Sequence, residues 1–123
     1  MRALIVDDSR AMRLILTRIL GELGFDTVDA QNGCEALARM AAGGPFDVAL
    51  VDWNMPEMNG YDFLVALRAD VAYRALPVIM VTTETETTQV VRALEAGANE
   101  YIMKPFTKDI IRGKLDLLRI GPG

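Results

Sequence analysis

The chain has 123 residues and a mass of 13.5 kDa, the size of one compact domain, and 51% of its residues are hydrophobic. Its 13 basic and 17 acidic residues give a net charge of −4 at pH 7, which argues against non-specific binding to nucleic acids or anionic membranes. The single cysteine, Cys34, excludes an internal disulfide, and the absence of histidine excludes Ser–His–Asp and Cys–His catalysis, histidine-based metal sites and a phosphohistidine carrier.

Five short apolar runs predict β-strands. In chain order they are Ala3–Val6, Thr27–Ala30, Val48–Val51, Val78–Val81 and Tyr101–Met103. Three of these runs are almost continuously apolar, which is typical of strands that are covered by helices on both faces. Glycines and prolines mark the turns between the elements, and Pro77 directly precedes the fourth strand.

A segment of helical length follows each strand, with apolar residues three or four positions apart. The expected core-facing stripes are Ala11, Ile15, Ile19 and Leu23; Ala36, Leu37 and Met40; Phe63, Leu64 and Leu67; Val90, Val91 and Leu94; and Ile110, Ile111, Leu115 and Leu118. Ser9 stands where it would cap the N-terminus of the first helix. The alternation predicts an α/β fold with a doubly wound parallel sheet and right-handed crossovers.

Targeting signals are missing from the sequence. The first apolar run ends at Asp7 and Asp8, which leaves no hydrophobic region for a signal peptide. No apolar run approaches the roughly 18 residues of a membrane helix. We therefore expect a cytoplasmic monomer that forms one domain over residues 1–123.

Reactive side chains stand where the predicted strands end. In chain order they are Asp7 and Asp8 after the first strand, Asp52 after the third, Thr82 after the fourth and Lys104 after the fifth. Because the carboxyl ends of parallel strands share one edge of a sheet, and ligands bind there, these groups are expected to converge. Any one of them alone could simply face solvent, but all of them together predict a functional site.

The residue types in this cluster define its chemistry. Three close carboxylates repel one another unless a cation lies between them, and Mg²⁺ is the hard, oxygen-preferring cation that suits them. Without imidazoles or a thiolate cluster, zinc and copper are disfavoured. A carboxylate at this place can attack a phosphoryl group, while Mg²⁺, Lys104 and the Thr82 hydroxyl stabilise the phosphoryl oxygens.

With these residues the chain resembles the receiver domains of two-component response regulators. The matching motifs are Val6–Asp7–Asp8, VDWNMPEMNG with Asp52, MVTTE with Thr82, and YIMKPF with Lys104. The resemblance covers essentially the whole chain and is strongest to the single-domain chemotaxis regulators, through DWNMP, ELGF and KPFT. It implies a flavodoxin-like (βα)5 sandwich with a five-stranded parallel sheet in the order 2-1-3-4-5.

The resemblance also implies residue roles at the site. Asp52 would accept the phosphoryl group from a histidine kinase. Asp8, Asp52 and the backbone carbonyl of Asn54 would ligate Mg²⁺, while Asp7 would act through water or supporting contacts. Lys104 would pair with the phosphoryl group.

Further roles concern switching and output. Thr82 would move toward the phosphate and Tyr101 would change its rotamer in response, while Asn54 and Glu84 would flank the mouth of the site and set the lifetime of the phosphorylated state. An output protein, such as a flagellar motor component, would bind the face formed by the fourth helix, the fifth strand and the fifth helix. The residues expected on this face are Val90, Tyr101 and Lys114.

Some positions near the site carry local expectations. Asn59–Gly60 replaces the family's usual Asp–Gly, and Asn also tolerates a left-handed turn. Thr83 is larger than usual beside the phosphate. Lys104 must turn back into the site, which predicts a cis bond to Pro105. Trp53 is expected to be a partly exposed packing residue.

The leading interpretation is a phosphorylation-controlled switch that binds a partner and acts on no outside substrate, so it is not an ordinary enzyme. One alternative is a phosphorelay intermediate that passes its phosphoryl group to a histidine phosphotransfer protein. Another is a phosphatase or dehalogenase with an aspartate nucleophile, but these need a second Asp where Asn54 stands. A flavodoxin-like flavin site is disfavoured because Asp7 and Asp8 would repel the flavin phosphate.

Overall fold

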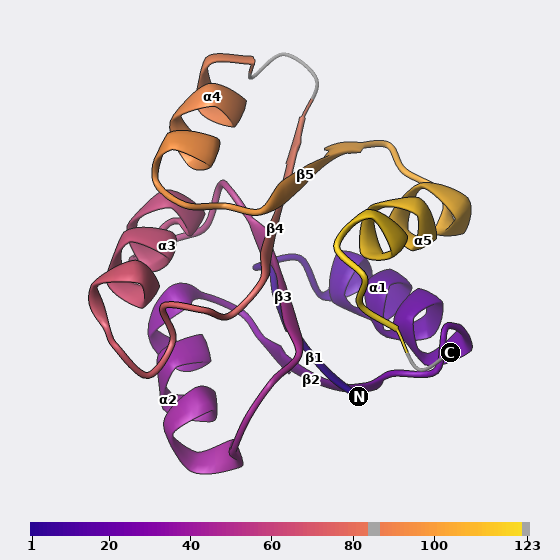
Figure 1. Ribbon diagram of the computed structural model, residues 1–123, viewed down its shortest axis with the longest axis horizontal. Coiled ribbons are helices and arrows are strands. Elements are labelled where there is room, and N and C mark those ends of the chain that lie inside the picture. Colours follow the sequence, from indigo (N-terminus) through magenta and orange to yellow (C-terminus); the bar gives the residue numbers. More distant parts are fainter. Residues whose placement is uncertain (84–86, 122–123) are drawn as a thin grey trace.

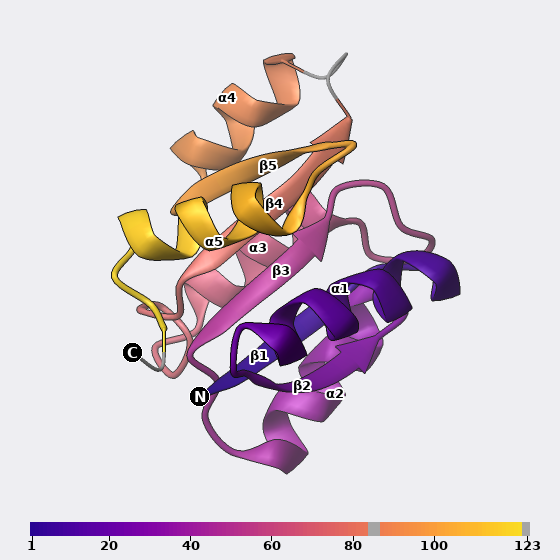
Figure 2. The same ribbon diagram turned by 90° about the vertical axis from the view of Figure 1, so that its right-hand side faces the viewer.

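Five parallel strands form one sheet in the order β2-β1-β3-β4-β5 in the computed structural model, which describes residues 1–83 and 87–121. The strands are β1 (Arg2–Val6), β2 (Asp26–Ala30), β3 (Val48–Asp52), β4 (Val78–Thr83) and β5 (Glu100–Lys104). All five predicted strands are confirmed, each extended by one or two residues, and so are the fold class and strand order. Because the strands run the same way, their carboxyl ends meet at one edge (Figure 2).

Helices cover both faces of the sheet. They are α1 (Arg10–Glu22), α2 (Gly33–Gly43), α3 (Gly60–Ala69), α4 (Thr87–Glu95) and α5 (Lys108–Leu117). Helices α2, α3 and α4 pack on one face, and α1 and α5 pack on the other (Figure 1). Within the described ranges, no helix is long and apolar enough to cross a membrane.

Side-chain caps fix where several helices begin. The Ser9 hydroxyl accepts a hydrogen bond from the Met12 N–H at 3.2 Å, which confirms the predicted cap of α1. Asn32, Asn59 and Thr107 cap α2, α3 and α5 in the same way. Since each helix follows a strand, these capped N-termini lie toward the edge where the strands end, and their backbone dipoles favour negative charge there.

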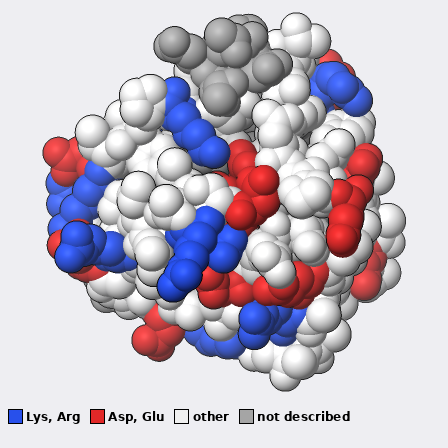
Figure 3. Space-filling view, turned by 180° about the vertical axis from the view of Figure 1, so that it is seen from behind, with Lys and Arg blue, Asp and Glu red and all other residues white. Residues whose placement is uncertain are grey.

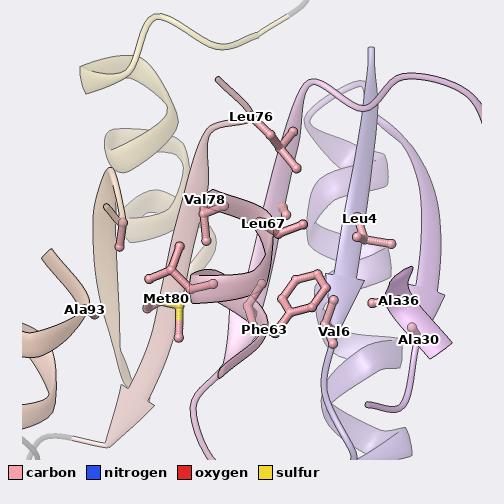
Figure 4. Close-up of a cluster of buried hydrophobic side chains, with 14 of the residues drawn as sticks. Leu4, Val6, Ala30, Ala36, Phe63, Leu67, Leu76, Val78, Met80 and Ala93 are labelled. Atoms are coloured by element: carbon pink, nitrogen blue, oxygen red, sulfur yellow. The ribbon is translucent and has the colours of Figure 1, made fainter. Parts of the chain in front are cut away.

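Two hydrophobic clusters fill the space between the layers. Phe63 and Leu67 of α3 lie against Val6 and Met80 of the sheet, within the cluster shown in Figure 4. The second cluster joins the opposite face of the sheet to α1 and α5. Strands β1, β3 and β4 are therefore buried on both faces, which explains their nearly continuous apolar sequences.

The buried face of α1 differs from the predicted stripe. The structure buries Leu16 and Leu20, whereas Ala11 is exposed and Ile15 is 46% exposed. The sequence of α1 contains two overlapping apolar stripes, because residues 14–16 and 19–20 are all apolar. Periodicity does not decide between such stripes; contact with the sheet does.

Helices α4 and α5 show the same kind of correction. Val91 and Leu94 were predicted to face the core but are 50% and 43% exposed, while Val90 and Ala93 are buried. Ile110 of α5 is likewise 44% exposed. The predicted stripes were too wide, since each helix buries only the part of its apolar surface that meets the sheet.

Candidate functional site

Three acidic side chains meet at the edge of the sheet where the strands end. Asp7 and Asp8 follow β1 directly, and Asp52 is the last residue of β3. Ligand oxygens of the three carboxylates lie within 4.8 Å of one another. Asp7 and Asp52 are buried, at 1% and 7% exposure, whereas Asp8 is exposed. Two of the three carboxylates are therefore shielded from solvent, and the cluster is open to solvent at Asp8.

Lys104, the last residue of β5, reaches into the same cluster. Its Nζ lies 3.1 Å from Asp52 Oδ1 and 3.6 Å from Asp7 Oδ2. The Lys104–Pro105 peptide bond is cis, as predicted. One ammonium group faces three carboxylates, so the cluster keeps an excess of negative charge.

Burial changes the acid–base behaviour of the two inner carboxyl groups. Loss of solvation raises the pKa of Asp52 to about 6; the nearby charge of Asp7 adds to this effect and Lys104 opposes it. Burial also raises the pKa of Asp7, against the hydrogen bond that the Ser9 N–H donates to its Oδ1 at 2.9 Å. The ionised cluster is therefore unfavourable when no further cation is present.

The cluster suits a hard divalent cation. Asp7 Oδ2 is buried and accepts no hydrogen bond from any described residue, because Lys104 Nζ at 3.6 Å is beyond hydrogen-bonding distance. All the ligand atoms are carboxylate oxygens, the donors that Mg²⁺ prefers. A cation bound here would pair with this buried oxygen and would offset the excess negative charge of the cluster.

The predicted switch residues lie on adjacent strands. Thr82 near the end of β4 is 3% exposed, and its Oγ1 makes no hydrogen bond within the described part of the chain. Tyr101 is half-buried on β5 and pairs with Met80, two residues before Thr82. Lys114 Nζ lies 4.8 Å from the centroid of the Tyr101 ring. The Thr82 hydroxyl therefore has no hydrogen-bond partner among the described residues, while the Tyr101 ring contacts Lys114 of α5.

A cleft of about 450 Å³ opens beside the carboxylates. It is lined by Asp8, Asn54, Met55, Pro56 and Asn59. Asn54 is exposed on this rim, which fits its expected place at the mouth of the site. Glu84, the other residue expected there, lies outside the described residues.

The expected partner surface changes in one residue. Val90 is only 8% exposed because it packs into the core, so it offers little surface to a partner. Val91 and Leu94 are the apolar side chains of α4 that reach solvent. Lys114 remains at this face, where its Nζ bonds Glu100 at 3.0 Å.

The segment after Asp52 differs from expectation in two ways. Asn59 is extended, with φ −73° and ψ 172°, and caps α3 rather than forming a left-handed turn. Gly60 is required at the start of α3 because a Cβ there would collide with the backbone oxygen of Asp52. Trp53 is buried at 5% exposure and not partly exposed, because Tyr61 of α3 packs against it with ring centroids 5.6 Å apart.

Two arginine contacts around the site could not be predicted from the sequence. Arg13 of α1 donates from Nη1 to the backbone oxygen of Asp7 at 2.8 Å. Arg92 of α4 stacks on the Tyr61 ring, with Cζ 4.5 Å from its centroid. Both read as ordinary polar positions on amphipathic helices, and no pattern in the sequence reveals their long-range contacts.

The sequence is similar to a protein family and to individual proteins over nearly its whole length. The family described as "Response regulator receiver domain" matches residues 3–116. Chemotaxis protein CheY1 of Helicobacter pylori strain J99 is 44% identical over 119 residues, covering 96% of each chain. A chemotaxis protein CheY homolog of Campylobacter jejuni strain 81-176 is 45% identical over 125 residues, covering all of this chain and 96% of that protein.

Solved structures agree with these sequence matches. Chemotaxis protein CheY4 of Vibrio cholerae, crystallised at pH 4.0, superposes with a TM-score of 0.85 at 34% identity, covering 97% of both chains. The receiver domain of a signal transduction histidine kinase from Syntrophus aciditrophicus gives a TM-score of 0.85 at 35% identity, covering 95% of this chain and 88% of that one. The similarity thus includes fold, sequence and nearly full length.

Proposed function

The chain belongs to the response regulator receiver domains, and on that premise we propose that it is a phosphorylation-activated switch of a two-component system. Asp52 accepts a phosphoryl group from a histidine kinase, and the phosphorylated protein changes its affinity for a partner protein. The observation that carries the proposal is the juxtaposition of Asp7, Asp8, Asp52 and Lys104 at one sheet edge. The similarity to chemotaxis proteins supports a cytoplasmic role in motility control.

Asp8, Asp52 and the backbone carbonyl of Asn54 would hold Mg²⁺, with Asp7 supporting it through water. Bound Mg²⁺ would offset the repulsion among the carboxylates and coordinate phosphoryl oxygens. The unpaired Asp7 Oδ2 and the excess negative charge support this assignment.

In the transfer step a carboxylate oxygen of Asp52 attacks phosphorus. The new O–P bond forms as the P–N bond to the donor imidazole breaks, and the imidazole nitrogen keeps the electron pair and takes up a proton. Lys104, which contacts Asp52 at 3.1 Å, turns to a phosphoryl oxygen and stabilises the charge on it. Hydrolysis later transfers the phosphoryl group to water and restores the carboxylate.

Phosphorylation would be read through Thr82 and Tyr101. A phosphoryl oxygen offers the Thr82 hydroxyl the hydrogen-bond partner that it lacks among the described residues. Inward movement of Thr82 would favour a second arrangement of Tyr101, as a shift between two populations. The output surface then comprises the exposed side of α4, β5 and α5, with Val91 and Leu94 on α4, Tyr101 on β5 and Lys114 on α5.

Intact-mass measurement after incubation with acetyl phosphate tests the acceptor. Wild-type protein should gain one phosphoryl group with Mg²⁺ and none in EDTA, and Asp52→Asn should gain none. Asp62→Asn is the matched control, because Asp62 is an exposed aspartate of α3. Undiminished phosphorylation of Asp52→Asn would refute the assignment.

A pull-down with and without beryllofluoride, a phosphoryl mimic, identifies the output. A motility protein retained only with beryllofluoride supports the switch. Rapid transfer of phosphate from Asp52 to a histidine phosphotransfer protein would favour the phosphorelay role instead.

A further inference from the structure

Asp7 is held by hydrogen bonds at almost every polar atom. Its N–H donates to the backbone oxygen of Ala30 at 3.0 Å, and its Oδ1 accepts from the Ser9 N–H at 2.9 Å. Its backbone oxygen accepts from Arg13 Nη1 at 2.8 Å. Of the polar atoms of Asp7, only Oδ2 finds no hydrogen-bond partner among the described residues, and this oxygen belongs to the acidic cluster. Asp7 is thus held by its N–H, its backbone oxygen and Oδ1, and its Oδ2 remains available to the proposed metal.

Of these three hydrogen bonds, one comes from the Arg13 side chain of α1. The other two link Asp7 to Ser9, in the same turn, and to Ala30, on the neighbouring strand β2. The Arg13 side chain is 16% exposed and is anchored at a second point, where Nε donates to Asp29 Oδ2 of β2 at 3.0 Å. The guanidinium therefore joins the carboxyl ends of β1 and β2 through two separate donors. A lysine could not reproduce this arrangement, because its ammonium group has no rigid fork.

The positive charge of Arg13 would not by itself favour Mg²⁺ binding. A cation next to a cation-binding site weakens binding through Coulomb repulsion, and here the ion pair with Asp29 offsets much of that charge. What Arg13 contributes is geometry, since it fixes the backbone from which both Asp7 and Asp8 extend.

We infer that Arg13 is a positioning residue for the metal site, acting through the backbone carbonyl of Asp7. The inference rests on the proposed function, because it assumes that Asp7 and Asp8 serve Mg²⁺. Removal of groups that orient metal ligands typically lowers metal affinity about 10- to 100-fold. A loss near the lower end is expected, since Ser9 and Ala30 still hold Asp7 after Arg13 is replaced.

The test measures Mg²⁺ affinity by isothermal titration calorimetry, in wild type and in three arginine variants. Arg13→Gln should bind Mg²⁺ about 10-fold more weakly. Arg13→Lys keeps the charge but loses the fork, and it should also bind more weakly. Arg10→Gln is the control, because Arg10 is exposed on the same helix and makes no hydrogen bond or ion pair to a described residue. Removing that cation should leave the affinity unchanged or raise it slightly.

The direction of the change in Mg²⁺ affinity separates the proposed positioning role of Arg13 from an effect of its charge alone. If Arg13 acts only through its charge, Arg13→Gln should bind Mg²⁺ more tightly, like Arg10→Gln, and such a result overturns the inference. If Arg13 is merely structural, its variants should unfold more easily in EDTA yet bind Mg²⁺ normally, which also overturns it. Should Arg13→Gln fail to fold, Arg13→Lys and Asp29→Asn decide, and unchanged affinity in both contradicts the inference.

The same measurements distinguish failure of the proposed function from failure of this inference. A wild-type protein that neither binds Mg²⁺ nor is phosphorylated refutes the function and this inference together. Normal wild-type binding and phosphorylation, with unchanged affinity in the Arg13 variants, refutes this inference alone.

Discussion

The Asp52 carboxyl group is more easily protonated in the folded protein than in the unfolded chain, because burial raises its pKa from 3.8 to about 6. Between about pH 4 and pH 6 the folded state therefore binds a proton that the unfolded state has released. The contribution of Asp52 to the free energy of unfolding is complete below pH 4 and is lost as the pH rises through 6. At neutral pH, without metal, the ionised group lowers stability.

Replacing this group should therefore stabilise the metal-free protein. In EDTA at pH 7, Asp52→Asn should raise the free energy of urea unfolding by roughly 2 kcal/mol, and the gain should shrink at pH 5. The same change at exposed Asp62 should leave the pH dependence as it is in wild type. An Asp52→Asn protein less stable than wild type at pH 7 would contradict this reading of the cluster.

The Thr82 hydroxyl gives a second expectation for a single residue. It is buried and lacks a hydrogen-bond partner among the described residues, so replacing it with a methyl group of similar size should stabilise the resting protein. Thr82→Val should gain about 1 kcal/mol in thermal unfolding. The same variant should still be phosphorylated but lose the beryllofluoride-dependent gain in partner affinity. Retention of that gain would show that Thr82 is not the switch.

Two glycines in helices are expected to affect stability in opposite directions when each is replaced by alanine. A Cβ on Gly60, at the start of α3, would collide with the Asp52 backbone oxygen and with Met80, whereas a Cβ on Gly113, within α5, meets no atom within 4 Å. Gly60→Ala should therefore destabilise the protein by about 1–3 kcal/mol and disturb the acceptor. Gly113→Ala should stabilise it by about 0.5–1 kcal/mol, because alanine has the higher helix propensity. Urea unfolding measures both changes, and equal effects would refute the contrast.

The order of elements was readable from the sequence, but the rotation of individual helices was not. Buried strands such as Val48–Asp52 can be recognised in the sequence because side chains on both of their faces are mostly apolar. Helix α1 offers Ile15 and Leu16 side by side, and only the sheet beneath it selects Leu16. Rotation depends on contacts between residues distant in sequence, and a local pattern carries no record of them.

The site divides in the same manner. Asp7, Asp52 and Lys104 were predicted to converge because strand ends meet at one edge, which is a property of topology. Arg13 and the burial of Trp53 depend on how α1 and α3 lie against the sheet, so they emerged only from the structure. Chemistry that follows from the strand ends is predictable; the support that neighbouring helices give it is not.

On the face shown in Figure 3, acidic side chains lie next to basic ones. The cluster of Asp7, Asp8 and Asp52 carries more negative charge than Lys104 alone can offset, so on the proposed function Mg²⁺ should act at this one place. Mg²⁺ bound at this cluster would stabilise the folded state alone, so it should raise the unfolding temperature at pH 7. Asp8→Asn should reduce that rise, whereas Asp62→Asn should not. An equal rise in all three proteins would mean that Mg²⁺ acts on general surface charge.

The cleft beside the carboxylates also limits the shape of any donor. Asp52 is only 7% exposed, and the rim of the cleft includes Asn54, Met55 and Pro56. If Asp52 is the phosphoryl acceptor, its burial requires a donor whose phosphoryl group projects from the donor's own surface. An imidazole raised on a convex helix satisfies the requirement, and so does a free acyl phosphate. If the proposed function holds, such a small donor can reach Asp52 without a partner protein, so the resting level of phosphorylation should follow the cell's pool of high-energy acyl phosphates.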